Sequence, residues 1–414
     1  MNKNLKIILT VILVVCVGFL GYKTFTSTIG KDPEITDIQA EFVGDIAPGE
    51  GLSKSMFNVK GITTSGKIVQ IKDFSSETGS AAEHGASFEL DIEAQGKKDT
   101  VIVDIKRTPV FQQNIGYPNE KDAVVTYYEN GDLEFTGKGV ITNFTDSLPW
   151  SDFDYSHVYI DETLKIENMD GWFEDNESLV YCDNIPKSVK TIKNTFSGCT
   201  SLKKAPDYFQ CSNLKIMDYA FAGCESLEEI DIIPVNVISM RYTFENCKKL
   251  QTPADLSKTS NLSDVMGMHK GNLYLREASE IPKTVINMSE CYEDCINIKK
   301  AVQFPPNVQN IINAYAGDKG LISGASIPDS VINMNGCYSG CSSLSGNLEI
   351  NTDTSEFSGF LVEATTNGDK LSLSGNSGNL LAIQKETTNN NIVLADPEAA
   401  AQQNERMLRE QEDI

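Results

Sequence analysis

The sequence is poor in histidine, the residue most often used for acid–base and metal chemistry. Only three occur in 414 residues, at His84, His157 and His269. Cys291 lies close to His269 in the repeat described below, but nothing in the sequence supplies an orienting group or oxyanion donors for a Cys–His pair. We therefore expect no enzyme, and neither a cofactor nor a bound metal.

Runs of basic residues are also missing. No Lys/Arg cluster is longer than a pair, and the formal net charge is -23. A protein that binds nucleic acid needs a concentration of positive charge facing the phosphate backbone. The charge pattern therefore excludes nucleic acid as an expected partner.

One long apolar run is present, at the N-terminus. Residues 7–22 carry no charge and lie between Lys6 and Lys23. As a helix they span about 24 Å, which flanking lysines extend across a bilayer. The following residues offer no small-x-small cleavage site, so we predict a cytoplasmic stub and signal-anchor helix within 1–30 and an extracellular remainder. A cleaved signal peptide would instead give a secreted protein. A sorting motif and an apolar C-terminal tail are both missing, so we expect any attachment to be N-terminal.

Residues 31–109 contain short bursts of alternating apolar and polar residues separated by turn-forming residues, which predicts a small β-sandwich. The bursts are EITDIQAEF, MFNVKGI, KIVQIKDF, ASFELDI and DTVIVDI. This region has no cysteine or tryptophan, so it lacks the disulfide and buried tryptophan of antibody domains. The order of its segments resembles bacterial Ig-like domains of surface proteins. Residues 110–165 then form a linker and a predicted hairpin, with its turn at Asn130-Gly131.

A repeat begins near residue 166. Its template is an aliphatic residue, an aromatic residue seven positions later, a small residue three positions after that, and a leucine or isoleucine three further on. The small-residue column recurs at intervals of 23 to 25 residues, at Asn176, Cys199, Cys224, Cys247, Asn272, Cys295, Asp318 and Cys341. This period predicts about eight coils of a leucine-rich-repeat solenoid over 166–395, with degenerate coils after Leu344. We expect His269 to stack as an aromatic substitute between Phe244 and Tyr292.

These repeats resemble the BspA-like leucine-rich repeats of bacterial surface proteins. The shared pattern is IPxsVxxMxxxFxxCxxL, and the segment ENGDLEFTGKGVITNFTDSLPWSDF is similar to the hairpin and PW cap that commonly precede it. The departures are Asn176, Asn272 and Asp318 in the cysteine column and His269 in the aromatic column. The resemblance implies a mainly β, cell-surface protein.

Three interpretations compete for the cysteine column. A metal site needs thiolates with closing partners, and the Cys291/Cys295 and Cys337/Cys341 pairs are separated by a coil without cysteine. A disulfide is compatible with the distance between stacked coils but not with side chains that point the same way. A structural column, in which a small side chain makes a weak hydrogen bond to the turn backbone, also explains the substitution by Asn and Asp. We favour this third interpretation.

The remaining segments complete the expected organisation. Residues 396–414 predict an acidic, solvated helix with Asp396 as N-cap and Pro397 as first residue. An acidic cluster at Asp152, Asp154, Asp161 and Glu162 lacks the spacing of a calcium loop and indicates a solvated face.

An elongated repetitive surface suits adhesion, that is, binding an extracellular protein or polysaccharide, better than enclosing a small substrate. The alternatives are a structural spacer and, less favoured, a cell-wall hydrolase. The candidate contact face consists of charged residues after the column leucine, which otherwise pair between coils: Lys203, Lys204, Glu228, Glu229, Lys299 and Lys300.

Overall fold

The computed structural model describes residues 34–412 except 77–78, 142 and 145–146. The described chain divides into two compact units, one drawn mainly from 34–44, 52–76 and 89–103, the other from 45–51, 80–88 and 104–412. Among these residues, no helix is both long and apolar enough to cross a bilayer. The predicted anchor at 7–22 lies outside the described residues.

The first unit contains two three-stranded antiparallel sheets, and all five predicted bursts form strands. Alternation brings Val59 and Ile92 into a buried core, while their chain neighbours face outward. The order β1-β2-β3 and β4-β5-β6 establishes small β-sheets but not an Ig-like topology. The strands are β1 (Ile35–Phe42), β2 (Phe57–Thr63), β3 (Ile68–Ile71), β4 (Ser75–Ser76), β5 (Ser87–Ala94) and β6 (Lys97–Asp104), with a 3-10 turn at Lys54–Met56.

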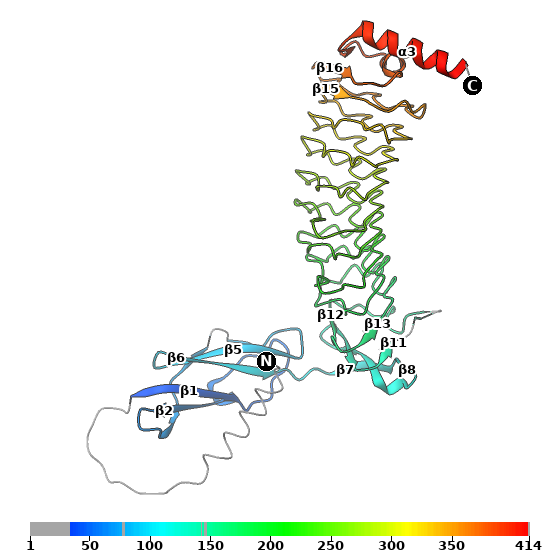
Figure 1. Ribbon diagram of the computed structural model, residues 1–414. Coiled ribbons are helices and arrows are strands. Elements are labelled where there is room, and N and C mark those ends of the chain that lie inside the picture. The colour runs from blue at the N-terminus through cyan, green and yellow to red at the C-terminus, as the bar shows by residue number, and fades with distance from the viewer. Residues whose placement is uncertain (1–33, 77–78, 142, 145–146, 413–414) are drawn as a thin grey trace, which may run out of the picture. The chain divides into compact units, whose positions relative to one another are not determined.

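The second unit begins with a cap sheet that starts the solenoid (Figure 1). The predicted hairpin is confirmed, because β9 and β10 pair antiparallel around a turn in which Gly131 has a φ of 83°. Strand order is β14-β12-β10-β9-β7, and a smaller sheet has the order β13-β11-β8. The strands are β7 (Pro109–Asn114), β8 (Gly116–Tyr117), β9 (Ala123–Tyr128), β10 (Asp132–Gly137), β11 (Val140–Ile141), β12 (His157–Ile160), β13 (Lys165–Ile166) and β14 (Tyr181–Cys182), with a 3-10 turn at Glu120–Asp122.

The tryptophan of the PW segment closes the apolar core at this end. Trp150 is fully buried, and its indole N–H donates to the Trp172 carbonyl at 2.9 Å. Its ring packs edge-on against Phe135 of β10 and Phe144. The cap therefore covers the apolar end that the first coil exposes, as a solenoid requires.

The coils are turns joined by single parallel bridges rather than long strands. One ladder connects successive coils through Asn168, Thr191, Ile216, Ser239, Asp264, Asn287, Asn310 and Asn333. Inside it the aromatic column stacks continuously, with ring centroids 5.3 to 5.9 Å apart from Phe196 to Tyr338. His269 stacks on Phe244 at 5.5 Å and on Tyr292 at 5.9 Å, as predicted.

The solenoid has about ten turns, namely the eight predicted coils of the small-residue column and the degenerate coils predicted after Leu344. These degenerate turns lack the cysteine column and pair through the parallel sheet β15 (Gly346–Glu349), β16 (Leu371–Ser374) and β17 (Ile392–Leu394). Helix α2 (Leu380–Thr387) packs on this sheet, and α3 (Pro397–Glu412) follows. The Asp396 carboxylate caps α3 by accepting from the Ala399 N–H at 2.9 Å. The first turn of α3 is docked rather than solvated, because Ala400 is buried.

Candidate functional site

The column cysteines link successive coils. Each of the five donates from Sγ to the carbonyl of the aromatic residue in the preceding coil, at 3.0 to 3.2 Å: Cys199, Cys224, Cys247, Cys295 and Cys341. The nine cysteines of the described chain are free and buried. Burial raises the pKa of the Cys224 thiol well above its usual range, so it stays a protonated donor rather than a reactive thiolate. Sequence reasoning expected a bond to the turn backbone; the acceptor belongs to the neighbouring coil.

The three non-cysteine column residues differ from one another. Asn176 Oδ1 accepts from the Ser178 N–H at 3.1 Å, and the Asn272 amide contacts Nδ1 of His269 at 3.1 Å. Asp318 is fully buried, and both its carboxyl oxygens lack a hydrogen-bond partner. Burial raises the pKa of this carboxyl well above its usual range. The Asp318 coil thus holds a buried carboxyl group where its neighbours hold a thiol.

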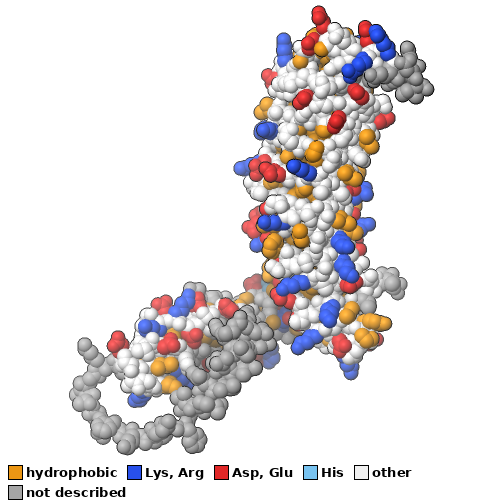
Figure 2. Space-filling view, viewed as in Figure 1, with side chains coloured by type: hydrophobic (Ala, Val, Ile, Leu, Met, Phe, Trp, Pro, Cys, Tyr) orange, Lys and Arg blue, Asp and Glu red, His pale blue; other side chains and the backbone are white. Residues whose placement is uncertain are grey.

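The candidate contact face is exposed, and part of it pairs between coils. Lys204 Nζ lies 3.4 Å from Glu229, and Lys249 Nζ lies 3.9 Å from Glu228. Exposed pairs of this kind contribute about 0.2–1 kcal/mol each, so they do not fix the lysines in place. Figure 2 shows basic and acidic side chains interspersed along the visible side of the solenoid. Lys203, Lys299 and Lys300 are also exposed, with Lys203 four coils from the other two.

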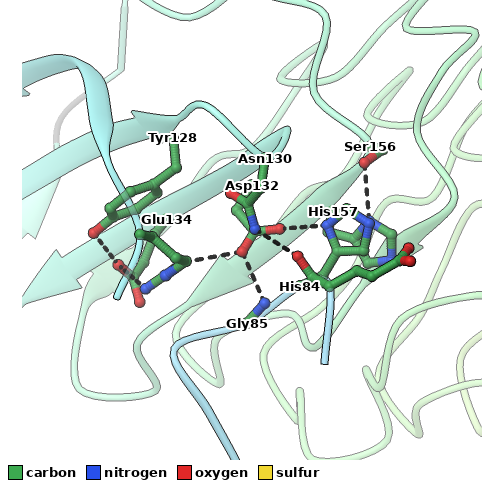
Figure 3. A network of polar contacts seen from close by, with 10 residues as sticks. His84, Gly85, Tyr128, Asn130, Asp132, Glu134, Ser156 and His157 are labelled. Carbon is green, nitrogen blue, oxygen red and sulfur yellow. Dashed lines mark hydrogen bonds and ion pairs between the residues drawn. The ribbon is translucent and has the colours of Figure 1, made fainter. Parts of the chain in front are cut away.

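A buried polar network lies on the outer face of the cap sheet and centres on Asp132 (Figure 3). Asp132 begins β10, directly after the Asn130-Gly131 turn, and its side chain is fully buried. It contacts three donors: His84 Nδ1 at 2.8 Å, the Gly85 N–H at 2.8 Å and Arg107 Nη1 at 3.2 Å. These contacts hold segment 80–88 against the sheet.

Arg107 extends the network to the next outward residue of β10. Its Nη2 donates to Glu134 at 2.9 Å, and its guanidinium lies 4.0 Å from the centre of the Tyr128 ring. Tyr128 Oη also donates to Glu134, at 2.7 Å. Burial, with the neighbouring carboxylate, raises the pKa of Tyr128 to about 12. The arginine therefore supplies the positive charge that offsets two carboxylates, the buried Asp132 and the partly buried Glu134.

Two histidines that are distant in sequence meet beside Asp132. His157 of β12 is the register partner of Asp132, and its ring stacks on His84 with centroids 3.6 Å apart. Its Nδ1 lies 3.0 Å from Ser156 Oγ. Burial, reinforced by the nearby His84, lowers the pKa of His157. Within the described residues, His84, Asp132 and His157 are the one group of three ligating side chains close together.

This arrangement clamps a segment and does not form a catalytic relay. A Ser–His–Asp triad needs one imidazole between the hydroxyl and the carboxylate. Here Ser156 contacts His157 whereas Asp132 contacts His84, and the two rings lie face to face. The oxygens of Asp132 already accept from three donors. The Cys291–His269 pair is equally unsuited to catalysis, because both residues are fully buried in the solenoid core.

A groove of about 380 Å³ opens beside the first coil. Phe153 and Trp172 line it together with five exposed carboxylates, Asp152, Asp154, Glu174, Asp175 and Glu177. Burial and the adjacent Asp175 raise the pKa of Glu174. Two members of the predicted solvated face thus line a concave site, whereas Asp161 instead accepts from Thr163 within its own turn.

Six copies of the repeat described as "BspA type Leucine rich repeat region" match this chain. They cover residues 165–264 and 274–384, together 211 of the 414 residues. The chain belongs to the BspA-type leucine-rich-repeat family. Members are repeat proteins, and the coils described above are the repeats of this family. No curated protein matches the chain.

Solved structures of bacterial leucine-rich-repeat proteins are similar to it. One from Eubacterium ventriosum is 15% identical, with 64% of this chain and 85% of that one covered and a TM-score of 0.35. One from Treponema pallidum is 21% identical, covering 54% and 88%, with a TM-score of 0.25. A leucine-rich cell surface protein from Faecalibacterium prausnitzii is 14% identical, covering 69% and 96%, with a TM-score of 0.24. Family membership rests on the repeat match alone.

Proposed function

We propose that this BspA-type protein is an outward-facing surface adhesin that binds an extracellular protein or polysaccharide through its solenoid. The groove at the first coil carries the proposal. It combines the partly exposed ring of Phe153 with exposed carboxylates in a concave site, which gives a ligand both apolar contact and fixed polar partners. The apolar segment 7–22 would attach the chain to the membrane, with the remainder outside.

The frame behind this surface supports a binding role. Backbone N–H groups of each coil donate to carbonyls of the next, as from Phe196 to Ala220 and from Phe221 to Thr243, both at 2.9 Å. The column thiols add a second bond between coils. The outward side chains are therefore held on a regular scaffold and bind with little loss of conformational entropy.

The test measures binding of the purified full chain to a glycan array and to a panel of immobilised extracellular proteins. We expect at least one ligand, weakened by the groove double variant Asp152→Lys/Glu177→Lys. The matched control Glu280→Lys/Asp329→Lys makes the same change in charge at exposed sites in distant coils. Binding that both doubles weaken equally, or that raised salt restores in the groove variant, would indicate non-specific electrostatics.

The contact face has its own test. The paired reversals Lys203→Glu/Lys204→Glu and Lys299→Glu/Lys300→Glu should each weaken binding, whereas Lys283→Glu, also exposed on the solenoid, should not. If the chain binds no probe, or if no solenoid variant changes binding, the solenoid is a spacer and the proposal is wrong.

One observation favours a hydrolase as the second candidate. The groove brings several carboxylates together, and the pKa of Glu174 is raised, as a general acid requires. Release of reducing sugar from a cell-wall polysaccharide by the wild type, abolished in Glu174→Gln, would favour this candidate over adhesion.

A further inference from the structure

A column of left-handed backbone runs along the solenoid from the groove. One residue in each coil has a φ between 52° and 68°: Gly171, Asn194, Tyr219, Tyr242, Gly267, Glu290, Asn313, Gly336 and Gly359. We call this the left-handed column. Its conformation is imposed by the stack, because each N–H from Gly171 to Gly336 donates to a carbonyl of the next coil at 2.7 to 3.0 Å. A residue at this position cannot relax into an ordinary conformation without breaking that bond.

Six of the nine column residues are Gly or Asn, the types that tolerate this region. The exceptions are Tyr219, Tyr242 and Glu290. Bulky side chains with positive φ are rare and carry a conformational cost, and such residues concentrate at functional sites. The three exceptions are therefore expected to make the solenoid less stable than Gly or Asn would at the same positions.

The exceptions form one cluster. The rings of Tyr219 and Tyr242 stack with centroids 4.9 Å apart and planes 15° apart. Tyr242 lies over Gly267, where a Cβ would come within 2.2 Å of the tyrosine ring. Its hydroxyl then reaches Glu290, two coils away, and donates at 3.2 Å. Gly267 thus provides the space that lets Tyr242 lie along the solenoid axis.

The charges around the cluster are largely internally paired. Lys270 Nζ lies 2.6 Å from the Glu290 carboxylate and 3.2 Å from that of Glu293. A cationic peptide would have to displace this lysine to reach either carboxylate. A neutral sugar needs no such displacement. Its apolar C–H face fits an aromatic ring, and its hydroxyls both donate and accept, which suits a mixture of tyrosine hydroxyl, ammonium and carboxylate groups.

The column also connects the cluster to the groove. Gly171, its first member, lines the groove, and Tyr219 stands two coils further along. A ligand that occupies both places must be elongated. We propose that Tyr219, backed by the stacked ring of Tyr242, forms a binding site for a pyranose ring of a neutral polysaccharide, whose chain continues into the groove. This inference rests on the proposed function and names its ligand class.

Affinity electrophoresis of the purified full chain tests the site, in gels that contain soluble β-glucan, arabinoxylan or galactomannan. We expect retardation in at least one gel. Tyr219→Asn/Tyr242→Asn should weaken the derived affinity at least about tenfold, the equivalent of losing one good aromatic contact. Asparagine suits the left-handed backbone, so the melting temperature should change little and loss of binding cannot be attributed to unfolding. Tyr274→Asn, which removes an exposed tyrosine outside the column, is the matched control.

The outcomes separate this inference from the proposed function. Retardation that the double variant abolishes and the Tyr274 variant retains supports the site. If the wild type is retarded in none of the three gels, the inference is wrong. It is also wrong if the wild type and the double variant are retarded equally. If the chain still binds an immobilised protein through the solenoid in that case, the proposed function stands and only the polysaccharide site is wrong.

Discussion

Replacing the buried acid of the cysteine column should stabilise the protein. Asp318 occupies the position from which neighbouring cysteines donate to the preceding coil, yet neither of its oxygens makes a well-formed hydrogen bond, and only the nearby Cys295 backbone favours its charged form. A buried polar group without a partner costs about 1–3 kcal/mol. Asp318→Cys restores the residue that the column usually holds. We expect its free energy of unfolding to exceed that of the wild type by about 1–3 kcal/mol at pH 4.

The advantage of Asp318→Cys should grow as pH rises. Burial raises the pKa of Asp318 in the folded state, so between the unfolded pKa of about 3.9 and the folded pKa only the unfolded chain loses the proton. The unfolded state then binds fewer protons than the native state, and wild-type stability falls with pH in this window. The slope is at most about 1.4 kcal/mol per pH unit. The cysteine variant lacks this contribution.

Urea denaturation at pH 4.5, 5.5 and 6.5 measures the effect. Asp318→Asn is the isosteric control, which removes the titration but keeps the shape, and should show the same pH trend relative to wild type. Asp329→Asn, at an exposed site, should show none. A stability difference between Asp318→Cys and wild type that stays constant across this range would refute the reasoning, as would a less stable variant.

Three further predictions concern the column, the network and the anchor. Cys224→Asn should change stability little, whereas Cys224→Leu should destabilise by about 1–3 kcal/mol through overpacking; mass spectrometry should find the column thiols free, and a Cys199–Cys224 disulfide in exported protein would contradict the column. Arg107→Met should lower the free energy of unfolding by about 1.5–3 kcal/mol, because the buried Asp132 keeps only His84 and the Gly85 N–H and Glu134 keeps only Tyr128, whereas Lys106→Met, at an exposed pair, should change it by less than about 0.5 kcal/mol. The full chain should stay in the membrane fraction after high salt and carbonate; mature protein starting near Lys31 in the medium would instead show a cleaved signal.

The regular part of the fold was predictable because its signals repeat. The spacing of seven between aliphatic and aromatic residues located each coil, and it identified His269 as a member of the stack. Local turn chemistry located the hairpin at Gly131 and the start of α3 at Pro397. The terminal turns could be predicted only as degenerate coils, because they keep the parallel ladder but lack the column residue that marks a coil.

The polar clusters were not predictable from the same signals. Asp132 meets His84 from 48 residues away and Arg107 from 25 residues away, with no period relating them. Asp132 shares a face of β10 with Glu134 and Thr136, so the alternation of the strand predicts a solvated side chain and gives no sign of its burial. The groove was missed for a similar reason: Asp152 and Asp154 looked like a solvated face until the fold placed Glu174 and Asp175 opposite them.

In a solenoid, exceptions to a column carry more information than its regular members. Stability of the solenoid favours a thiol in the cysteine column and Gly or Asn in the left-handed column. Residues that follow this pattern are explained by the fold alone. Asp318 and the Tyr219–Tyr242 pair both depart from the residue that stability favours, but they face opposite ways. Asp318 is sealed in the core, where no ligand reaches it, so replacing it should stabilise the protein and leave binding unchanged. The tyrosines are half-buried at the solenoid surface, with Tyr219 two coils from the groove, so replacing them should leave stability nearly unchanged and remove binding. Stability and ligand binding should therefore be measured on both sets of variants. The two measurements distinguish an unusual column residue that the fold merely tolerates from one that serves a ligand.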